Sequence, residues 1–115
     1  MKRKIRILML FEAATFVAAS LIHSGVMITG SDHQKARIAE GVIATVLLVG
    51  AAFSWVRPAW TRQAGLAAQG FALLGTLVGI FTITVGVGPR TIPDVAYHVA
   101  IVVILVWGLM FARRA

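Results

Sequence analysis

Five side chains with acid–base or metal-binding chemistry lie toward one end of the apolar segments of this chain. Asp94 and His98 are four residues apart, and Arg37 lies three residues before Glu40, so each pair shares one face of a helix. His23, Glu40 and His98 also fall at similar distances from the expected helix ends. We therefore expect three helices to form one polar binding pocket, with these members: His23, Arg37, Glu40, Asp94 and His98.

The residue types in this group permit several kinds of chemistry. Two histidines and a carboxylate, here His23, Glu40 and His98, suit a divalent transition metal, and two histidines can ligate a haem iron. The same histidines can form hydrogen bonds with a quinone, while Arg37 can hold an anionic headgroup or a partner carboxylate. No ExxH pair and no HExxH motif is present. Metal, haem and quinone therefore remain open alternatives.

A purely structural interpretation of the same residues is also open. Asp94 can cap a helix, Arg37 and Glu40 can pair at the membrane interface, and His23 or His98 can be hydrogen-bonded packing residues. The convergence of three helices at one depth is what favours a site.

Glu12 is a separate candidate, because it lies inside the first apolar segment. It precedes His23 by 11 residues, or about three helical turns, so the two side chains share a face that must point inward. Gln69 is expected at a comparable depth as its neutral partner. Glu12 is then either a protonated, hydrogen-bonded structural residue or a proton or cation site.

Composition indicates that the solvent around these residues is lipid. Of 115 residues, 59% are apolar and 13% are charged, and the charges fall between the apolar segments. The net charge of +7 forms no basic stripe, which argues against nucleic-acid binding. Cysteine is absent, which excludes disulfides and thiolate metal sites. No serine has a sequence signal of activation, so hydrolytic catalysis is not expected.

We predict an all-α, integral membrane four-helix bundle with up-down-up-down topology and a single transmembrane domain, 1–115. Each expected helix has about the 20 apolar residues that span a bilayer, and the four cover residues 5–28, 32–56, 64–85 and 94–112. Capping boxes are predicted at Ser31–Gln34 and Thr91–Asp94. Glu12 interrupts what would otherwise resemble a signal peptide, so we expect the first helix to be retained.

Loop charges predict the orientation of the bundle. One side carries an excess of basic residues, which the positive-inside rule places in the cytoplasm together with both termini; they are Lys2, Arg3, Lys4, Arg6, Arg57, Arg62, Arg113 and Arg114. This orientation fits a bacterial inner membrane. Gly75 and Gly79 form a GxxxG pattern, which predicts close helix packing inside one bundle or, alternatively, a homo-oligomer.

The chain resembles the DoxX-like family of small four-helix bacterial membrane proteins. The resemblance rests on the segment Ala36–Gly41, the segment Leu47–Gly50, Arg57-Pro58 and the Gly/Ala-rich third helix. Members are membrane partners of redox enzymes, including thiosulfate:quinone oxidoreductase. The resemblance implies a binding or accessory subunit, with a membrane or periplasmic protein partner. His23-Ser24-Gly25 and the Asp94/His98 pair are not features of that family.

A second resemblance is to the small multidrug-resistance transporters. Those proteins share the approximate length, the four helices and a membrane-embedded glutamate in the first helix, where Glu12 lies. The resemblance implies a proton-coupled transporter as an alternative function. The third helix here lacks their aromatic and small-residue signature, and they have no need of a histidine cluster.

Overall fold

The structure is a computed structural model that describes residues 1–25 and 33–115. In these residues the chain forms four α-helices and one short 3-10 helix. Their bounds are α1 Lys2–His23, α2 Gln34–Val56, η1 Pro58–Trp60, α3 Thr61–Thr84 and α4 Ile92–Arg113. Each α-helix is long and apolar enough to cross a membrane. The prediction of an all-helical chain with four such helices is confirmed.

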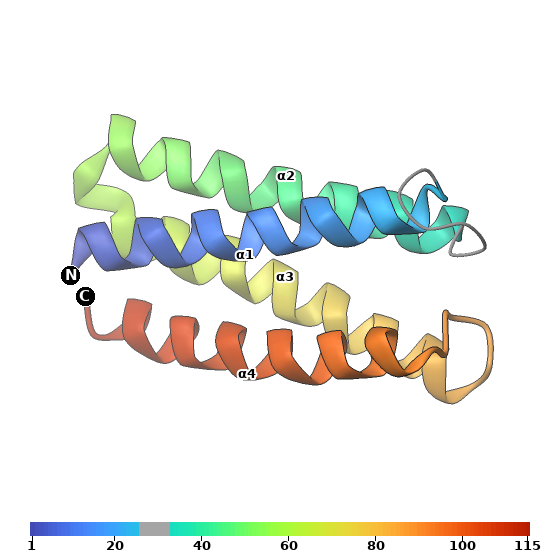
Figure 1. Ribbon diagram of the computed structural model, residues 1–115. Helices are drawn as coiled ribbons and strands as arrows, with labels where there is room; N and C mark the ends of the chain where they lie inside the picture. Colours follow the sequence, from blue (N-terminus) through green and yellow to red (C-terminus); the bar gives the residue numbers. More distant parts are fainter. Residues whose placement is uncertain (26–32) are drawn as a thin grey trace.

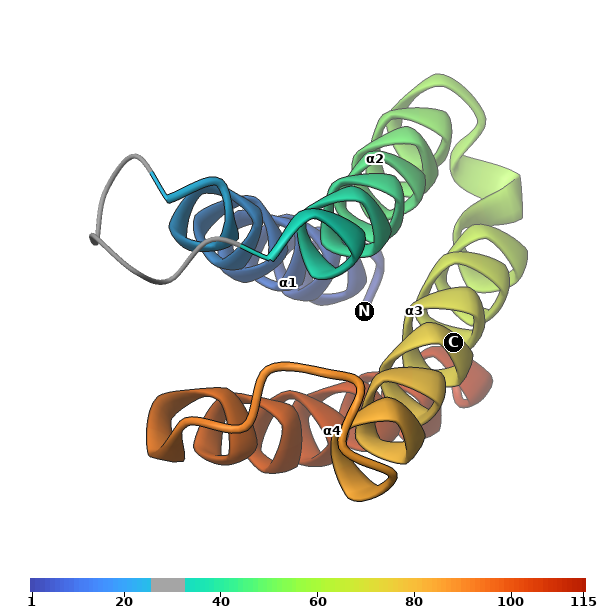
Figure 2. The ribbon, with the colours of Figure 1, turned by 90° about the vertical axis from the view of Figure 1, so that its right-hand side faces the viewer.

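The four helices run alternately up and down along one long axis (Figure 1). Both chain termini and the connection between α2 and α3 lie at the same end of the bundle (Figure 1). The predicted basic loops therefore lie at one end, and His23 and Asp94 lie at the other. Seen along the axis, the helices follow one another in chain order, and α1 and α4 are farther apart than consecutive helices (Figure 2).

The first two helix boundaries differ from the expected ones. Helix α1 ends at His23, because Gly25 adopts a left-handed conformation with φ of 80° that an L-residue rarely takes. The expected end at Ile28 lies outside the described residues. Helix α2 begins at Gln34, and its N-cap is His33, whose Nδ1 accepts a hydrogen bond from the Ala36 N–H. Ser31 and Asp32, which the sequence suggested as caps, also lie outside the described residues.

The later boundaries follow identifiable local signals. Helix α3 begins at Thr61, three residues before the expected start, because the 3-10 turn at Pro58–Trp60 leads directly into it. Gly86, with φ of 87°, turns the chain after α3. The predicted capping box of Thr91 and Asp94 is confirmed, and α4 accordingly begins at Ile92.

A chain of hydrogen bonds closes the end of the bundle that carries the termini. The Arg6 guanidinium donates to Ser54 Oγ and to the Ser54 carbonyl oxygen, both at 2.8 Å. Thr61 Oγ1 donates to the Pro58 carbonyl oxygen, so the Ser54 hydroxyl donates to Thr61 over 2.7 Å. A cation thus binds a carbonyl group at the C-terminal end of α2, where the helix dipole favours positive charge.

Small residues allow the helices to approach closely. A methyl group added at Gly75 would lie 2.8 Å from Ile43 Cδ1 of α2, and one added at Gly79 would lie 3.0 Å from His98 Nε2 of α4. Both glycines therefore pack against this chain's own side chains, as the interpretation of packing within one bundle predicts. A larger set of apolar side chains fills the core around them, including Ile5, Met9, Phe16, Leu47, Ala68, Ala72, Ile101 and Leu105.

We predict opposite effects for two glycine substitutions on α2 and α3. Gly50→Ala places a methyl group 2.7 Å from Ala68 Cβ, so the helices must separate at a cost of about 1–3 kcal/mol. Gly70→Ala meets no atom within 4 Å and gains helix propensity of up to about 1 kcal/mol. Thermal unfolding in detergent should therefore show a lower midpoint for Gly50→Ala only. Equal midpoints for the two variants would contradict this packing.

Candidate functional site

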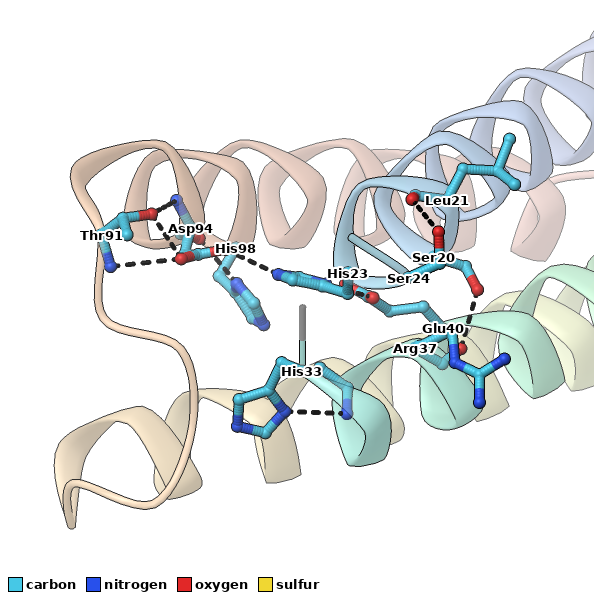
Figure 3. A network of polar contacts seen from close by, with 11 residues as sticks. Ser20, Leu21, His23, Ser24, His33, Arg37, Glu40, Thr91, Asp94 and His98 are labelled. Carbon is cyan, nitrogen blue, oxygen red and sulfur yellow. Dashed lines mark hydrogen bonds and ion pairs between the residues drawn. The ribbon is translucent and has the colours of Figure 1, made fainter. Parts of the chain in front are cut away.

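His23 is held between two carboxylates at the end of the bundle opposite the termini (Figure 3). Its Nδ1 lies 2.6 Å from Glu40 Oε1, and its Nε2 lies 2.9 Å from Asp94 Oδ1. The three residues come from α1, α2 and α4, and they join helices that are distant in sequence. The expected convergence of His23, Glu40 and Asp94 is therefore present, and we call these residues the His23 clamp.

The ends of two helices place this clamp. His23 is the last residue of α1, where a cation is favoured, and Asp94 lies in the first turn of α4, where an anion is favoured. Asp94 also accepts hydrogen bonds from the backbone N–H and hydroxyl of Thr91 through Oδ2, which leaves Oδ1 for His23. The capping box of α4 thus orients the carboxylate that binds the histidine.

The hydrogen bonds of the His23 clamp determine how many protons it holds. A neutral imidazole has one N–H and one lone pair, whereas both ring nitrogens here face carboxylate oxygens. Either the ring carries two protons, or one carboxyl group carries a proton and donates it to the ring. The clamp therefore holds two exchangeable protons among its three side chains, and its net charge is −1.

A cavity of about 230 Å³ lies next to the clamp, between α2, α3 and α4. Its wall is mainly aliphatic and glycine, and its ionisable members are His33, Lys35, Glu40, Tyr97 and His98. The remaining lining residues are Phe16, Ala36, Ala39, Ile43, Gly75, Thr76, Val78, Gly79, Thr82, Val87, Gly88 and Pro89. An apolar protein cavity of roughly 150 Å³ accommodates benzene, so this one has room for a substituted six-membered ring.

Two hydrogen-bond acceptors of the cavity wall lack partners in the described residues. His98 Nδ1 lies 2.7 Å from the Asp94 carbonyl oxygen and must donate to it, so the neutral ring has its lone pair on Nε2. That nitrogen lies beside Gly79, another lining residue. Glu40 uses Oε1 for His23, and its Oε2 makes no hydrogen bond within residues 1–25 and 33–115. Because both residues line the cavity, His98 Nε2 and Glu40 Oε2 are its candidate acceptors for a ligand that donates hydrogen bonds.

The predicted site residues thus divide into separate groups. His23 and Asp94 belong to the clamp, His98 lines the cavity, and Glu40 does both. Arg37 is exposed and lines no part of the cavity; its backbone carbonyl oxygen accepts a hydrogen bond from Ser20 at 2.8 Å.

The described residues do not form the metal site that His23, Glu40 and His98 suggested. Within them, no group of three or more His, Cys, Asp or Glu side chains is arranged to hold a metal ion. The physical reason is that both ring nitrogens of His23 face carboxylate oxygens, so the ring has no free lone pair for a metal. A metal on this trio would require the clamp to open.

Two lining residues of the cavity, Tyr97 and His33, are not among the site residues predicted from the sequence. Tyr97 fits an interfacial aromatic belt by position, but its ring packs edge-on against Phe16 at 5.8 Å and its hydroxyl lies 3.0 Å from Thr15 Oγ1. Since Thr15 donates its own proton to the Glu12 carbonyl oxygen, Tyr97 is the donor to Thr15. His33 Nε2 reaches the Val87 carbonyl oxygen at 3.2 Å. Neither contact has a signal in the sequence, because each depends on helices that meet only in the fold.

Glu12 lies near the middle of α1 and is completely buried, as its shared face with His23 predicts. Gln69 of α3 is also completely buried. Both residues approach Gly108 of α4, which places them together at a distance from the His23 clamp.

We predict that His23→Ala destabilises the protein by about 3–5 kcal/mol, because it leaves the buried Glu40 carboxyl group without its donor and removes one partner of Asp94. Thermal or denaturant unfolding in detergent would measure the loss. Arg37→Ala is the matched control, since its side chain is exposed, and should change stability by less than about 0.5 kcal/mol. Similar stability of the wild type and His23→Ala would mean that the clamp does not hold the helices.

Comparisons with protein-family models, with curated proteins and with solved structures found no match to this chain. The resemblance to the DoxX-like family therefore remains a prediction from sequence pattern. Function must be inferred from the clamp, the cavity and the chemistry of their residues.

Proposed function

We propose that this chain is a bacterial inner-membrane protein that binds a quinol-type ligand and acts as an accessory subunit of a redox complex. Four long apolar helices support membrane insertion, as do the many large apolar side chains exposed on all of them. The excess of basic residues at the end with both termini supports a cytoplasmic location for that end. The clamp and cavity then belong to the extracytoplasmic half.

The observation that carries the proposal is the cavity with two acceptors that have no partner in the described part of the chain. A membrane-soluble ligand must enter an apolar space, and it must satisfy His98 Nε2 and Glu40 Oε2 if it displaces water from them. An aromatic ring with hydroxyl groups meets both demands. Its ring fits the volume, and its O–H groups donate to the two acceptors.

The two acceptors also favour the reduced ligand, a quinol, over the oxidised one, a quinone. A quinone offers only carbonyl acceptors, and neither a neutral His98 Nε2 nor Glu40 Oε2 can donate to them. A quinone bound through the exposed Lys35 of the lining would still leave both of these acceptors without a donor. A quinol supplies the donors, and its oxidation releases protons that a histidine and a carboxylate can accept. The electrons must pass to a redox partner, and this is the role that the resemblance to the DoxX-like family implies for a neighbouring protein.

The proposed accessory role follows from the chemistry of the residues that line the cavity. Its residues bind and orient a ligand and accept protons, and the clamp fixes the position of Glu40 through His23. The structure favours no second function at this site, because the histidine and carboxylate that would ligate a metal are engaged with each other.

Direct binding to the purified protein in lipid nanodiscs tests the proposal. A water-soluble hydroquinone analogue and its quinone should be compared by calorimetry, and the hydroquinone should bind more tightly. His98→Phe removes one acceptor and should weaken hydroquinone binding by roughly tenfold, equivalent to one hydrogen bond of about 1.4 kcal/mol. Gly79→Ala should also weaken it, because the added methyl group lies 3.0 Å from His98 Nε2.

Arg37→Ala serves as the control variant, since that side chain lies outside the cavity, and its affinity should equal that of the wild type. Hydroquinone affinity unchanged in both His98→Phe and Gly79→Ala would refute binding in this cavity. Tighter binding of the quinone than of the hydroquinone would refute the assignment of the two acceptors.

A further inference from the structure

Three buried oxygen atoms that have no hydrogen-bond partner among residues 1–25 and 33–115 lie in the middle of the bundle. They are both carboxyl oxygens of Glu12 and the Oε1 of Gln69, and both side chains are 0% exposed. A methyl group added at Gly108 would overlap Gln69 Oε1 and lie 3.1 Å from Glu12 Oε2, so both oxygens border the same space. Glu12 of α1, Gln69 of α3 and Gly108 of α4 surround this space, and we call these three residues the Glu12 centre.

The orientation of the Gln69 amide makes the Glu12 centre rich in acceptors. Gln69 Nε2 donates to the Gly65 carbonyl oxygen at 3.1 Å, which directs the amide oxygen toward Gly108 and Glu12. Within the described residues, the centre then contains three acceptor atoms and no available donor. Buried acceptors without a donor are unfavourable, and an ionised carboxylate beside an amide oxygen is the worst arrangement of them.

No cation of the described chain neutralises Glu12. The ion pairs found within residues 1–25 and 33–115 both belong to His23. Arg6, on the same helix, binds Ser54, and Lys4 Nζ lies over the ring of Phe111 at 5.8 Å from its centroid. The other carboxyl groups of the described residues, Glu40 and Asp94, are engaged in the His23 clamp.

We propose that the Glu12 centre is a proton-binding site, in which Glu12 carries a proton and donates it to Gln69 Oε1. One proton converts the carboxylate into a neutral acid with one donor, and that donor satisfies two of the three unpartnered oxygens at once. A hard metal ion is a poorer fit, because such ions take about six oxygen ligands and only three unpartnered oxygens are present here. The site is independent of the cavity and of quinol binding.

Gly108 gives this site its space. Any larger residue at position 108 would displace the Gln69 amide oxygen from Glu12. The proposed hydrogen bond between Glu12 and Gln69 therefore requires glycine at this position. The proton lies near the midpoint of α1, deep in the proposed membrane span, where exchange with water requires a local opening of the bundle.

Infrared spectroscopy of the protein in bilayers at neutral pH tests the proposal. We expect a carboxylic-acid C=O band that shifts after prolonged exchange into D₂O and is lost in Glu12→Gln. Glu40→Gln is the matched control and should keep this band. Gln69→Leu removes the acceptor and should move the band. If the Glu12→Gln difference spectrum shows loss of a carboxylate band instead, Glu12 is ionised and the proposal fails.

A second measurement needs no variant. A hydrophobic carbodiimide reacts with protonated carboxyl groups inside membranes, so mass spectrometry should find an adduct on Glu12 in the wild-type protein. Sodium chloride should not change the yield relative to choline chloride at equal ionic strength. Protection by sodium would show that a cation occupies the centre, and it would overturn the assignment of a proton.

Discussion

A polar group that leaves water must find a partner, and this constraint governs the arrangement of the whole bundle. Four helices satisfy their own backbone groups and leave only a few polar side chains to be accommodated. At one end Arg6 binds α2 through Ser54, and at the other His23 joins α1 to α2 and α4. These contacts supplement close packing around small residues. The contact of His23 with Asp94 joins α1 to α4, which lie farther apart than consecutive helices.

The two buried acidic regions respond to the same constraint in different ways. In the His23 clamp, two carboxyl groups share one imidazole, so both ring nitrogens have partners and the three side chains together carry a net charge of −1. In the Glu12 centre the described part of the chain supplies acceptors alone, and the proposed proton on Glu12 provides the donor. The cavity has two acceptors without a partner among the residues that the structure describes, and a bound ligand can supply their donors.

The sequence predicted the parts that depend on composition and local signals. Apolar length predicted four helices, Thr91 and Asp94 predicted the start of α4, and the spacing of Glu12 and His23 predicted a buried face. It did not predict the inward Tyr97, because that orientation depends on a contact between α1 and α4. It also did not predict His33 as the N-cap of α2, because histidine is not among the residues that usually cap helices. Nor could spacing show that Arg37 points outward while Glu40, less than one turn later, points inward.

Both ring nitrogens of His23 face carboxylates, whereas His98 Nε2 has no hydrogen-bond partner within the described residues and can bind a ligand. Nitrogen-15 solid-state NMR of histidine-labelled protein in bilayers observes both rings directly. On addition of a hydroquinone, we expect the Nε2 resonance of His98 to move toward that of a hydrogen-bonded nitrogen, while both His23 resonances stay in place. A His98 resonance unchanged at saturating ligand, or a shift confined to His23, would contradict this account.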